Sequence, residues 1–494
     1  MVFATLLADP LLAQQNKPAD EHNAVASTPE AQPASLEERS ILRAARQNDW
    51  LSVRRLLKEE STADVSDADG TSLVHWAVFH QQSNELRWLI ERGAKVDQPN
   101  QYQVTPLSLA CEYGHEQCAK TLIEQQADIE TTRLGGERPL MLAARSQSLP
   151  IVQALIAAKV KLDAREKNGQ TALMWAAAAG HATIVDALLD AGADRDIATK
   201  KSGFNAFLFA AREGKSAVIQ RMIDAGCDVN QTLKPIRTGG RNPRKNMSAL
   251  MLAVESGHLD LALKLVDQGA DPNDQRSGFS PLHAITWVRK TKLGDNPEGD
   301  PPPRIDGKSG TLAFVREIVQ RGADVNLVLK TGRSPGKAQL NNRGATPFML
   351  AAKTADLPLL KLLAELGADA TVNNADGCTP LMACAGIGAV AVGEEPGTED
   401  EVIATIRWLM EANIDINTVD ANGETAMHGA AYRNYPRVVS LLASLGADPA
   451  IWNKKNRFGW TPFDIASGKR PGSLKPSPAT AAALDQAKET FQSK

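Results

Sequence analysis

The stretch "NGQTALMWAAAAGHATIVDALLDAGAD", residues 168–194, consists mainly of small and apolar residues and contains no grouping of side chains typical of catalysis. Thr171 suits the start of a helix, because its hydroxyl can accept a hydrogen bond from the first turn. Gly180 suits the end of that helix, because glycine readily adopts a left-handed backbone. After this glycine, a second apolar stripe has helical spacing, namely Ile184, Val185, Leu188 and Leu189. The stretch therefore predicts two short helices joined by a tight turn.

Such a pair of helices needs neighbours. We expect Leu173 and Ala176 to face the second helix, where alanine allows close approach, and Gly192 to end that helix. Asp194 and the residues after it should form a hairpin-like turn. A single pair cannot bury both of its faces, whereas stacked copies bury a continuous core. The stretch therefore predicts further copies along the chain.

Copies of the pattern do recur. Clear copies begin at Thr105, Thr171, Ser248, Thr346 and Thr425, and degenerate copies begin at Arg39, Ser72, Arg138, Asn205, Ser280 and Thr379, with a partial copy, "TPFDIA", from Thr461. The first five copies in chain order start 33 residues apart. This period, together with the pattern T-P-L-H-x-A and the Gly-Ala-Asp ending, resembles the ankyrin repeat.

The resemblance covers roughly residues 38–467 and implies an all-α solenoid. We expect a stack of about eleven helix-turn-helix repeats with short β-hairpin-like turns and terminal caps. The polar copy at Arg39 fits an N-terminal cap. Residues 468–494 fit a C-terminal capping segment, with a helix from about Ala479 to Phe491.

The N-terminal region differs from the repeats. Residues 1–13, "MVFATLLADPLLA", are mostly apolar and end at a small residue, as in a secretory signal, although no basic residue precedes them and Asp9-Pro10 interrupts them. We interpret them as a remnant of a signal peptide, with a disordered cytosolic leader as the alternative. Residues 14–37 have the composition of a disordered linker. The expected location is thus periplasmic or secreted, and otherwise cytoplasmic.

Four insertions interrupt the period. Residues 231–247 and 327–343 lengthen turns between repeats, on what should be the finger edge, whereas residues 288–310 and 386–401 separate the two helices of one repeat. The two finger insertions are basic and free of acids, and their bases include Arg241, Arg244, Arg333 and Lys337. Residues 386–401 include the acidic stretch "GEEPGTEDE". Two interpretations stay open: solvated loops, or a shared basic binding edge.

Most histidines and cysteines have structural explanations. His75, His283 and His428 occupy the T-P-L-H position, where the repeat uses His to tie neighbouring turns, and three more follow the glycine between helices. His80 is the only one in the repeats without such a place. The five cysteines form no C-x-x-C pair and no zinc spacing, so neither a disulfide framework nor a metal site is expected. Cys111 and Cys118 should lie on facing helices, as free thiols or as a disulfide.

Candidate binding residues occupy positions that the solenoid does not need. By the ankyrin resemblance, the residue before the capping Thr and the two before the inter-helix Gly face the concave groove. The groove candidates are Phe79, Tyr113, Arg145, Arg212, Trp287, Tyr432 and Arg433. Aromatic rings and Arg dominate interface hot spots. Phe204, Phe279 and Trp460 could instead pack between repeats.

The predicted function follows from these observations. We expect a monomeric, non-enzymatic protein-binding scaffold that uses the concave groove and the fingers, with no cofactor. The alternatives are an accessory subunit of a cell-envelope enzyme and a secreted effector. The net charge is −3 and the insertions lack interleaved aromatic residues, so a nucleic-acid partner is not expected. Apart from the short N-terminal run, no apolar stretch approaches the length needed to insert into a membrane.

Overall fold

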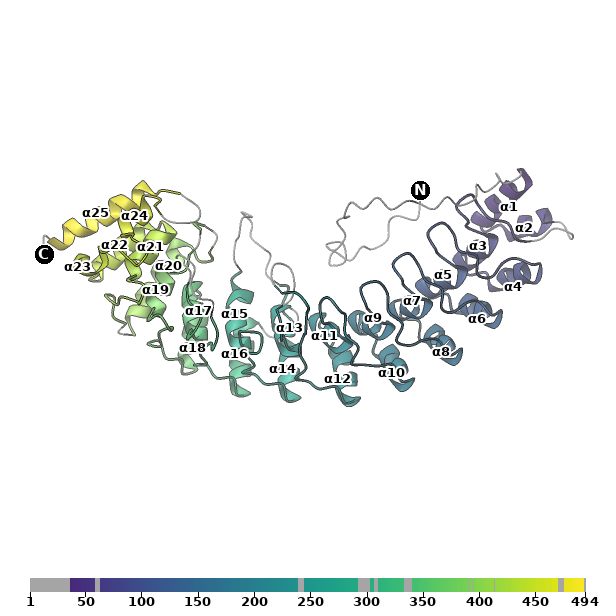
Figure 1. Cartoon of the computed structure of the whole chain (residues 1–494), viewed down its shortest axis with the longest axis horizontal. Helices are drawn as coiled ribbons and strands as arrows, with labels where there is room; N and C mark the ends of the chain where they lie inside the picture. Colours follow the sequence, from purple (N-terminus) through teal and green to yellow (C-terminus); the bar gives the residue numbers. More distant parts are fainter. Residues whose placement is uncertain are drawn as a thin grey trace.

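The computed structural model forms a long arch of two helical layers (Figure 1). It describes residues 36–57, 63–238, 244–291, 303–305, 310–332, 340–389, 391–393, 395–412, 414–469 and 475–492. In these ranges the chain forms helices α1–α25 and no strand, with only two isolated antiparallel bridges, Ser66–Ser72 and Thr232–Ser248. The expected signal remnant at residues 1–13 and nearly all of the linker at residues 14–37 lie outside the described residues.

The concave layer holds the first helix of each pair. These inner helices are α3 (Leu73–Phe79), α5 (Pro106–Tyr113), α7 (Pro139–Arg145), α9 (Ala172–Ala179), α11 (Ala206–Arg212), α13 (Ala249–Glu255), α15 (Pro281–Arg289), α17 (Pro347–Lys353), α19 (Pro380–Ala385) and α21 (Ala426–Arg433). Each packs directly against the next along the arch.

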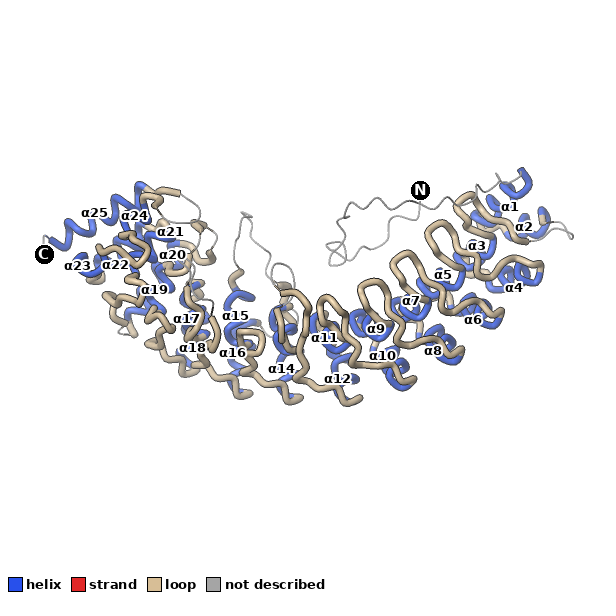
Figure 2. The backbone as a smooth tube through the Cα atoms, viewed as in Figure 1, coloured by secondary structure: helices blue, strands red, loops and turns tan. Residues whose placement is uncertain are grey.

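The convex layer holds the second helix of each pair. These outer helices are α4 (Ser83–Glu91), α6 (Glu116–Glu124), α8 (Leu149–Ala157), α10 (Ala182–Asp190), α12 (Ser216–Asp224), α14 (Leu259–Asp267), α16 (Thr311–Gln320), α18 (Leu357–Glu365), α20 (Glu399–Met410) and α22 (Pro436–Ser444). Loops join each outer helix to the next inner helix and form a row along the stack (Figure 2).

Both ends of the stack are closed by additional helices. At the N-terminus, α1 (Leu36–Arg46) and α2 (Trp50–Leu56) form a first pair, and α1 packs on α3. At the C-terminus, α23 (Pro449–Trp452) and α24 (Pro462–Ala466) precede the long helix α25 (Pro478–Gln492). This last helix covers α22 and α24. Helices α1–α22 thus make eleven pairs, and the expected ankyrin-type solenoid is confirmed.

The capping residues define where the inner helices begin and end. The side chain of Thr105 accepts a hydrogen bond from the Ser108 backbone N–H, and that of Thr171 accepts one from Met174. Gly180 ends α9 with φ of 91°, and its N–H donates to the Ala176 carbonyl. A residue with a Cβ would be strained at this φ.

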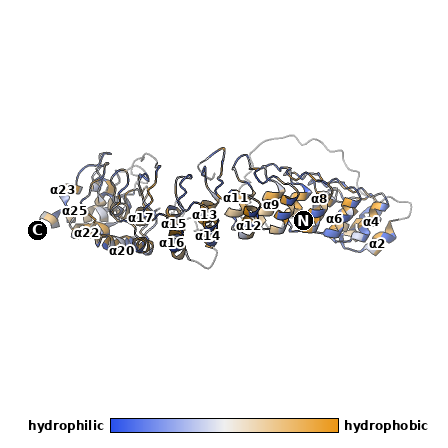
Figure 3. Ribbon diagram, turned by 90° about the horizontal axis from the view of Figure 1, so that it is seen from below, coloured by the Kyte–Doolittle hydropathy of each residue, from blue (hydrophilic) through white to orange (hydrophobic). Residues whose placement is uncertain are grey.

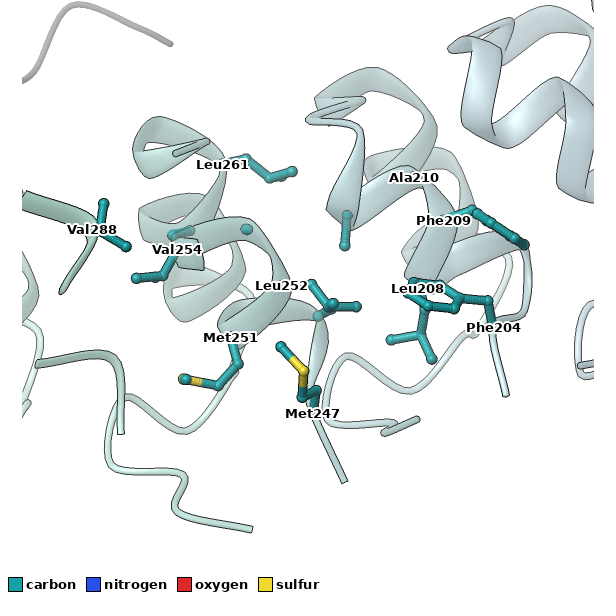
Figure 4. Close-up of a cluster of buried hydrophobic side chains, with 14 of the residues drawn as sticks. Phe204, Leu208, Phe209, Ala210, Met247, Met251, Leu252, Val254, Leu261 and Val288 are labelled. Carbon is teal, nitrogen blue, oxygen red and sulfur yellow. The ribbon is translucent and has the colours of Figure 1, made fainter. Parts of the chain in front are cut away.

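The core runs without a break from repeat to repeat. Ala176 and Ala177 are fully buried in the seam of the inner helices, and Ile184, Val185 and Leu188 are fully buried on α10, while Leu189 is only partly covered. Figure 4 shows how bulkier side chains fill the junction between α11 and α13, with Phe204, Leu208, Met247 and Leu252 close together. Figure 3 shows the stack from below, with hydrophobic stretches along the helices.

Histidine side chains connect the turns of consecutive repeats. His115 Nδ1 lies 2.8 Å from the Val78 carbonyl, and His181 and His258 make the same kind of bond to Arg145 and Arg212. His80, which had no place in the sequence pattern, also belongs to this series, because its Nε2 lies 3.1 Å from the Arg46 carbonyl. His80 therefore does have a structural role in the repeats, which the sequence pattern did not predict.

The alanine seam yields a first prediction. Ala176→Leu should lower the free energy of unfolding by about 1–3 kcal/mol, because the buried seam has no room for three more carbon atoms. The loss should extend to adjacent repeats, whose stability depends on the shared interface. Urea denaturation followed by circular dichroism measures the change. Ala191→Leu, at an exposed position on the same helix pair, is the control, and equal stability of both variants would contradict the seam.

The buried histidines yield a second prediction. Burial lowers the pKa of His283 from 6.5 to about 4, while its Nε2 lies 3.2 Å from the Ala345 carbonyl. Between pH 6.5 and 5 the unfolded chain binds this proton and the folded chain does not, so stability should fall by about 1.4 kcal/mol per pH unit for this residue. His283→Asn should be less stable at pH 7 but should show a shallower pH dependence in denaturant titrations. An unchanged slope would contradict a neutral buried His283.

Candidate functional site

The candidate residues of the N-terminal half lie at the C-terminal ends of inner helices, on the concave layer. Phe79 and Tyr113 come from α3 and α5, and their ring centroids are 6.2 Å apart in an edge-to-face arrangement. Tyr113 is 42% exposed, whereas Phe79 is half-buried. We call this group, together with the rings that touch it, the N-terminal aromatic cluster: Trp76, Phe79, His80, Tyr113 and His115.

The histidines of the cluster have two roles. The Tyr113 ring stacks on His115 with centroids 5.6 Å apart, and the Phe79 ring meets His80 edge-on at 5.1 Å. The same two imidazoles hold the turns to the preceding repeats. The inter-repeat hydrogen bonds therefore also orient the aromatic surface, which is presented as a rigid unit.

Arginines cover aromatic rings further along the concave layer. The Arg145 guanidinium lies 4.9 Å from the Trp175 centroid, and Arg212 lies 4.9 Å from Phe204 and 5.1 Å from Phe209. At half-exposed sites such contacts are worth about 0.5–1 kcal/mol each. These arginines keep part of their surface in solvent while being held in place.

Acidic side chains balance these arginines. Glu112 accepts hydrogen bonds from both Arg145, at 3.1 Å, and Arg133, at 2.7 Å. Glu213 pairs with Arg212 at 2.7 Å. The concave layer therefore carries alternating charges over an aromatic base.

Trp287 and Arg244 lie in one group. The Trp287 ring meets Phe279 edge-on at 5.0 Å, and the Arg244 guanidinium lies 5.7 Å from Phe279 and 5.9 Å from Trp287. Arg244 is also paired with Glu255. The side chain of Arg244, one of the bases of the predicted basic edge, folds back onto aromatic rings and a carboxylate, and its part in partner binding stays a prediction. The other three basic candidates of the finger insertions, Arg241, Arg333 and Lys337, lie outside the described residues.

Tyr432 and Arg433 were expected on the groove surface, and this expectation was also wrong. Tyr432 is fully buried, and its hydroxyl donates to Glu424 Oε1 at 2.7 Å. Arg433 is buried and donates to the carbonyls of Lys353, Pro396 and Gly397 at 2.9–3.1 Å. The insertion between α19 and α20 covers Arg433, whereas Tyr432 is held by Glu424 and Asn456 from the loops before α21 and α24.

The same insertion was expected to be a solvated acidic loop. Instead Glu395 is buried, and its Oε2 lies 3.5 Å from Lys353 Nζ. Glu401 caps α20 and pairs with Lys290 at 2.8 Å. A signal for this packing was present in the sequence. Gly386 and Gly429 face each other so closely that a Cβ on Gly386 would lie 2.3 Å from the Gly429 carbonyl oxygen.

Sequence reasoning also missed three rings of the inner helices that support arginines, of which two are buried and Trp175 is partly covered. Trp76, Trp175 and Phe209 each stand four residues after a capping Ser, Thr or Asn, and each lies beneath an arginine. Most other repeats have Leu or Ala there. Comparing residues at one register position, rather than only those near the turns, would have found them.

We next consider metal-binding groups and reactive thiols among the described residues. They contain no group of three His, Cys, Asp or Glu side chains suited to a metal ion, and none of their helices is both long and apolar enough to cross a bilayer. All five cysteines are free thiols, and burial raises the pKa of Cys118 to about 11 and that of Cys384 to about 12. A thiolate nucleophile is disfavoured at these positions near neutral pH.

The buried carboxyl group of Glu424 has a raised pKa. Glu424 accepts hydrogen bonds from Tyr432 and, at 3.0 Å, from Asn456 Nδ2. Burial raises its pKa from 4.5 to about 7, and the neighbouring Asp420 adds to this effect. Below about pH 7, the folded protein therefore favours the protonated form of Glu424.

Glu424→Gln should stabilise the protein above pH 7. A raised pKa means that stability is lost as pH rises from the unfolded value toward the folded one, so the amide should add up to about 3 kcal/mol at pH 8 and little at pH 4.5. Denaturant titrations at both pH values measure this difference. Glu411→Gln, at an exposed position, is the control, and an equal effect of Glu424→Gln at both pH values would contradict the titration.

Comparison with known proteins agrees with this geometry. A family model for ankyrin repeats in three copies matches residues 41–133, 140–233 and 207–288, and a second ankyrin-repeat model matches residues 399–443. The chain is similar to ankyrin repeat and SOCS box protein 16 of Mus musculus, with 27% identity over 236 residues, which cover 45% of this chain and 48% of the mouse protein.

Two further relatives match shorter parts. Ankyrin repeat, SAM and basic leucine zipper domain-containing protein 1 of Dasypus novemcinctus is 27% identical over 28% of this chain and 25% of its own length. Neurogenic locus notch homolog protein 1 of Danio rerio is 29% identical over 36% of this chain and 7% of its own length. The chain thus spans about half or less of these relatives. With the repeat period, the paired helices and the family models in agreement, the chain belongs to the ankyrin-repeat family.

Proposed function

We propose that this protein is a non-enzymatic scaffold that holds another protein in its concave groove. Ankyrin repeats generally mediate protein–protein interaction, and the relatives are ankyrin-repeat proteins. The observation that carries the proposal is the N-terminal aromatic cluster. Tyr113 exposes 42% of its surface at a position where the fold needs no large side chain.

The cluster has the physical properties of a binding hot spot. The imidazoles of His80 and His115 are fixed by hydrogen bonds to the preceding turns, and the rings of Phe79 and Tyr113 pack on them, so little side-chain freedom remains to be lost on binding. Arg145 beside Trp175 extends the surface toward the middle of the arch. Aromatic rings and arginines of this kind contribute most of the energy in many protein interfaces.

Capture of the partner is the first experimental step. The full chain, immobilised and exposed to native extract, should retain a protein that can then be produced and titrated against it. Wild-type protein and Tyr113→Ala are compared by calorimetry and by thermal melting. If purified protein instead turned over a substrate, the non-enzymatic assignment would be lost.

Tyr113→Ala should weaken binding of that partner at least tenfold, which corresponds to about 1.4 kcal/mol, and should leave the melting temperature nearly unchanged. Phe491→Ala is a matched control, because Phe491 is 44% exposed on α25, far from the groove. Equal binding by wild type and Tyr113→Ala would rule out the cluster as the contact. A large drop in melting temperature would show that Tyr113 serves packing instead.

A further inference from the structure

The middle of the finger edge carries exposed bases without counter-charges. Three consecutive inter-repeat loops carry, beyond Lys159 and Lys161 near the end of α8, the exposed basic side chains Arg165, Lys167, Lys200, Lys201, Lys234, Arg237 and Lys245. We call this set the central basic row. Across the described part of the chain, no carboxylate forms an ion pair with any of them.

The three loops lie side by side through backbone contacts. The Ile236 N–H donates to the Lys201 carbonyl at 3.2 Å, which joins the second loop to the third. Gly203 lies so close to Lys234 that an added Cβ would be 2.6 Å from its carbonyl carbon. Gly169 likewise approaches Lys200, with a Cβ-to-nitrogen distance of 3.7 Å. The bases are therefore held at the spacing of the repeats.

Several acids near these loops bind backbone N–H groups, while Asp196 in the second loop is exposed. Glu166 stands between two bases in the sequence, but it is buried and its carboxylate accepts the N–H groups of Asn168 and Gln170 at 2.8 and 2.9 Å. Asp163 and Asp194 lie at the bases of the loops and accept backbone N–H groups of the adjoining turns. Within residues 164–170, 197–204 and 229–247, the described part of the chain holds one acid, the buried Glu166.

Exposed bases also occur on later fingers, at Lys330, Arg343, Lys454 and Lys455, but the first finger and those of Asp376 and Asp420 carry acids. The first finger carries Asp67, which pairs with Arg46, and Asp69, which accepts from Thr71. Toward the C-terminus, Asp376 and Asp420 accept hydrogen bonds from Asn422. With a net charge of only −3 for the chain, the row is a local feature rather than a result of bulk charge.

We propose that the central basic row binds an extended acidic peptide segment of a partner protein, with carboxylates at about every third residue. Neighbouring helices pack about 8–10 Å apart, and an extended chain advances about 3.3 Å per residue, so every third side chain meets the next loop. Ile236 is 73% exposed beside Arg237 and offers an apolar contact for an intervening residue.

This proposal rests on the proposed scaffold function and specifies the chemistry of one partner segment. A protein segment fits the row better than a single-stranded nucleic acid. Single-strand binding sites combine basic grooves with aromatic rings that stack on bases. The aromatic residue of these loops, Phe204, is buried in the core.

The test is a titration of the full chain with a labelled peptide of about twelve residues that carries Glu at every third position. Binding, measured by fluorescence anisotropy, should weaken steeply with added salt, because exposed charges are screened. The triple variant Lys201→Glu, Lys234→Glu and Arg237→Glu should bind at least about tenfold more weakly. A peptide with Gln in place of Glu should not bind.

A matched triple variant controls for net charge. Lys264→Glu, Lys361→Glu and Arg407→Glu make the same change on exposed positions of the outer helices α14, α18 and α20. Equal weakening by both triple variants would overturn the proposal, as would a lack of binding at low salt. Tighter binding of single-stranded DNA of similar length, lost in the finger variant, would show a nucleic-acid surface instead.

The outcomes separate this proposal from the scaffold function. If the captured partner loses affinity for Tyr113→Ala but binds the finger variant as well as wild type, the scaffold function stands and the basic row has no part in it. If the finger variant loses both peptide and partner, the row supplies a contact. Melting curves of the finger variant, expected to match wild type, exclude unfolding as the cause.

Discussion

The whole structure depends on the close approach of inner helices in adjacent repeats. Each helix pair has an apolar face that only the next pair can cover. The apolar side chains are therefore buried only when the pairs are stacked. Small side chains such as Ala176 and Ala177 let the inner helices pack directly, while the stripe of Ile184, Val185 and Leu188 fills the space toward the outer layer. The concave layer is therefore narrow and continuous, and side chains at the helix ends face outward in rows.

This constraint explains why the concave surface can hold large rings at little cost to the fold. A position that points into the groove has no partner across a seam, so its size is not limited by packing. Tyr113 and Trp287 occupy such places, and arginines lie over several other rings in the same layer. The histidines of the turns then add a second benefit, since they tie repeats together and also support Tyr113. The same histidines therefore stabilise the stack and orient the exposed ring of Tyr113.

Much of this architecture could be predicted from the sequence because it is local and periodic. The cap of α9, the left-handed Gly180 and the buried Ala176 all follow from one 33-residue pattern. Tyr432 and Arg433 could not be placed in this way. They occupy the register of exposed groove residues, but Arg433 is covered by the insertion of the preceding repeat, and Tyr432 is buried against Glu424 and Asn456. The position of a residue in the repeat predicts where its backbone lies. Whether its side chain is exposed depends on tertiary contacts.

Tertiary contacts also determine which charged residues of the insertions form ion pairs. An insertion within a repeat begins and ends beside its neighbours' turns, so its polar groups find partners there: Glu395 meets Lys353, and the nearby Arg289 meets Asp356 at 2.6 Å. An insertion between repeats extends the finger edge away from the helices. Its exposed bases, such as Lys234 and Arg237, meet water rather than carboxylates. Charge close to the helical layers therefore serves cohesion, as does Arg244 through Glu255, whereas Lys234 and Arg237 on the finger form no ion pair in the described part of the chain.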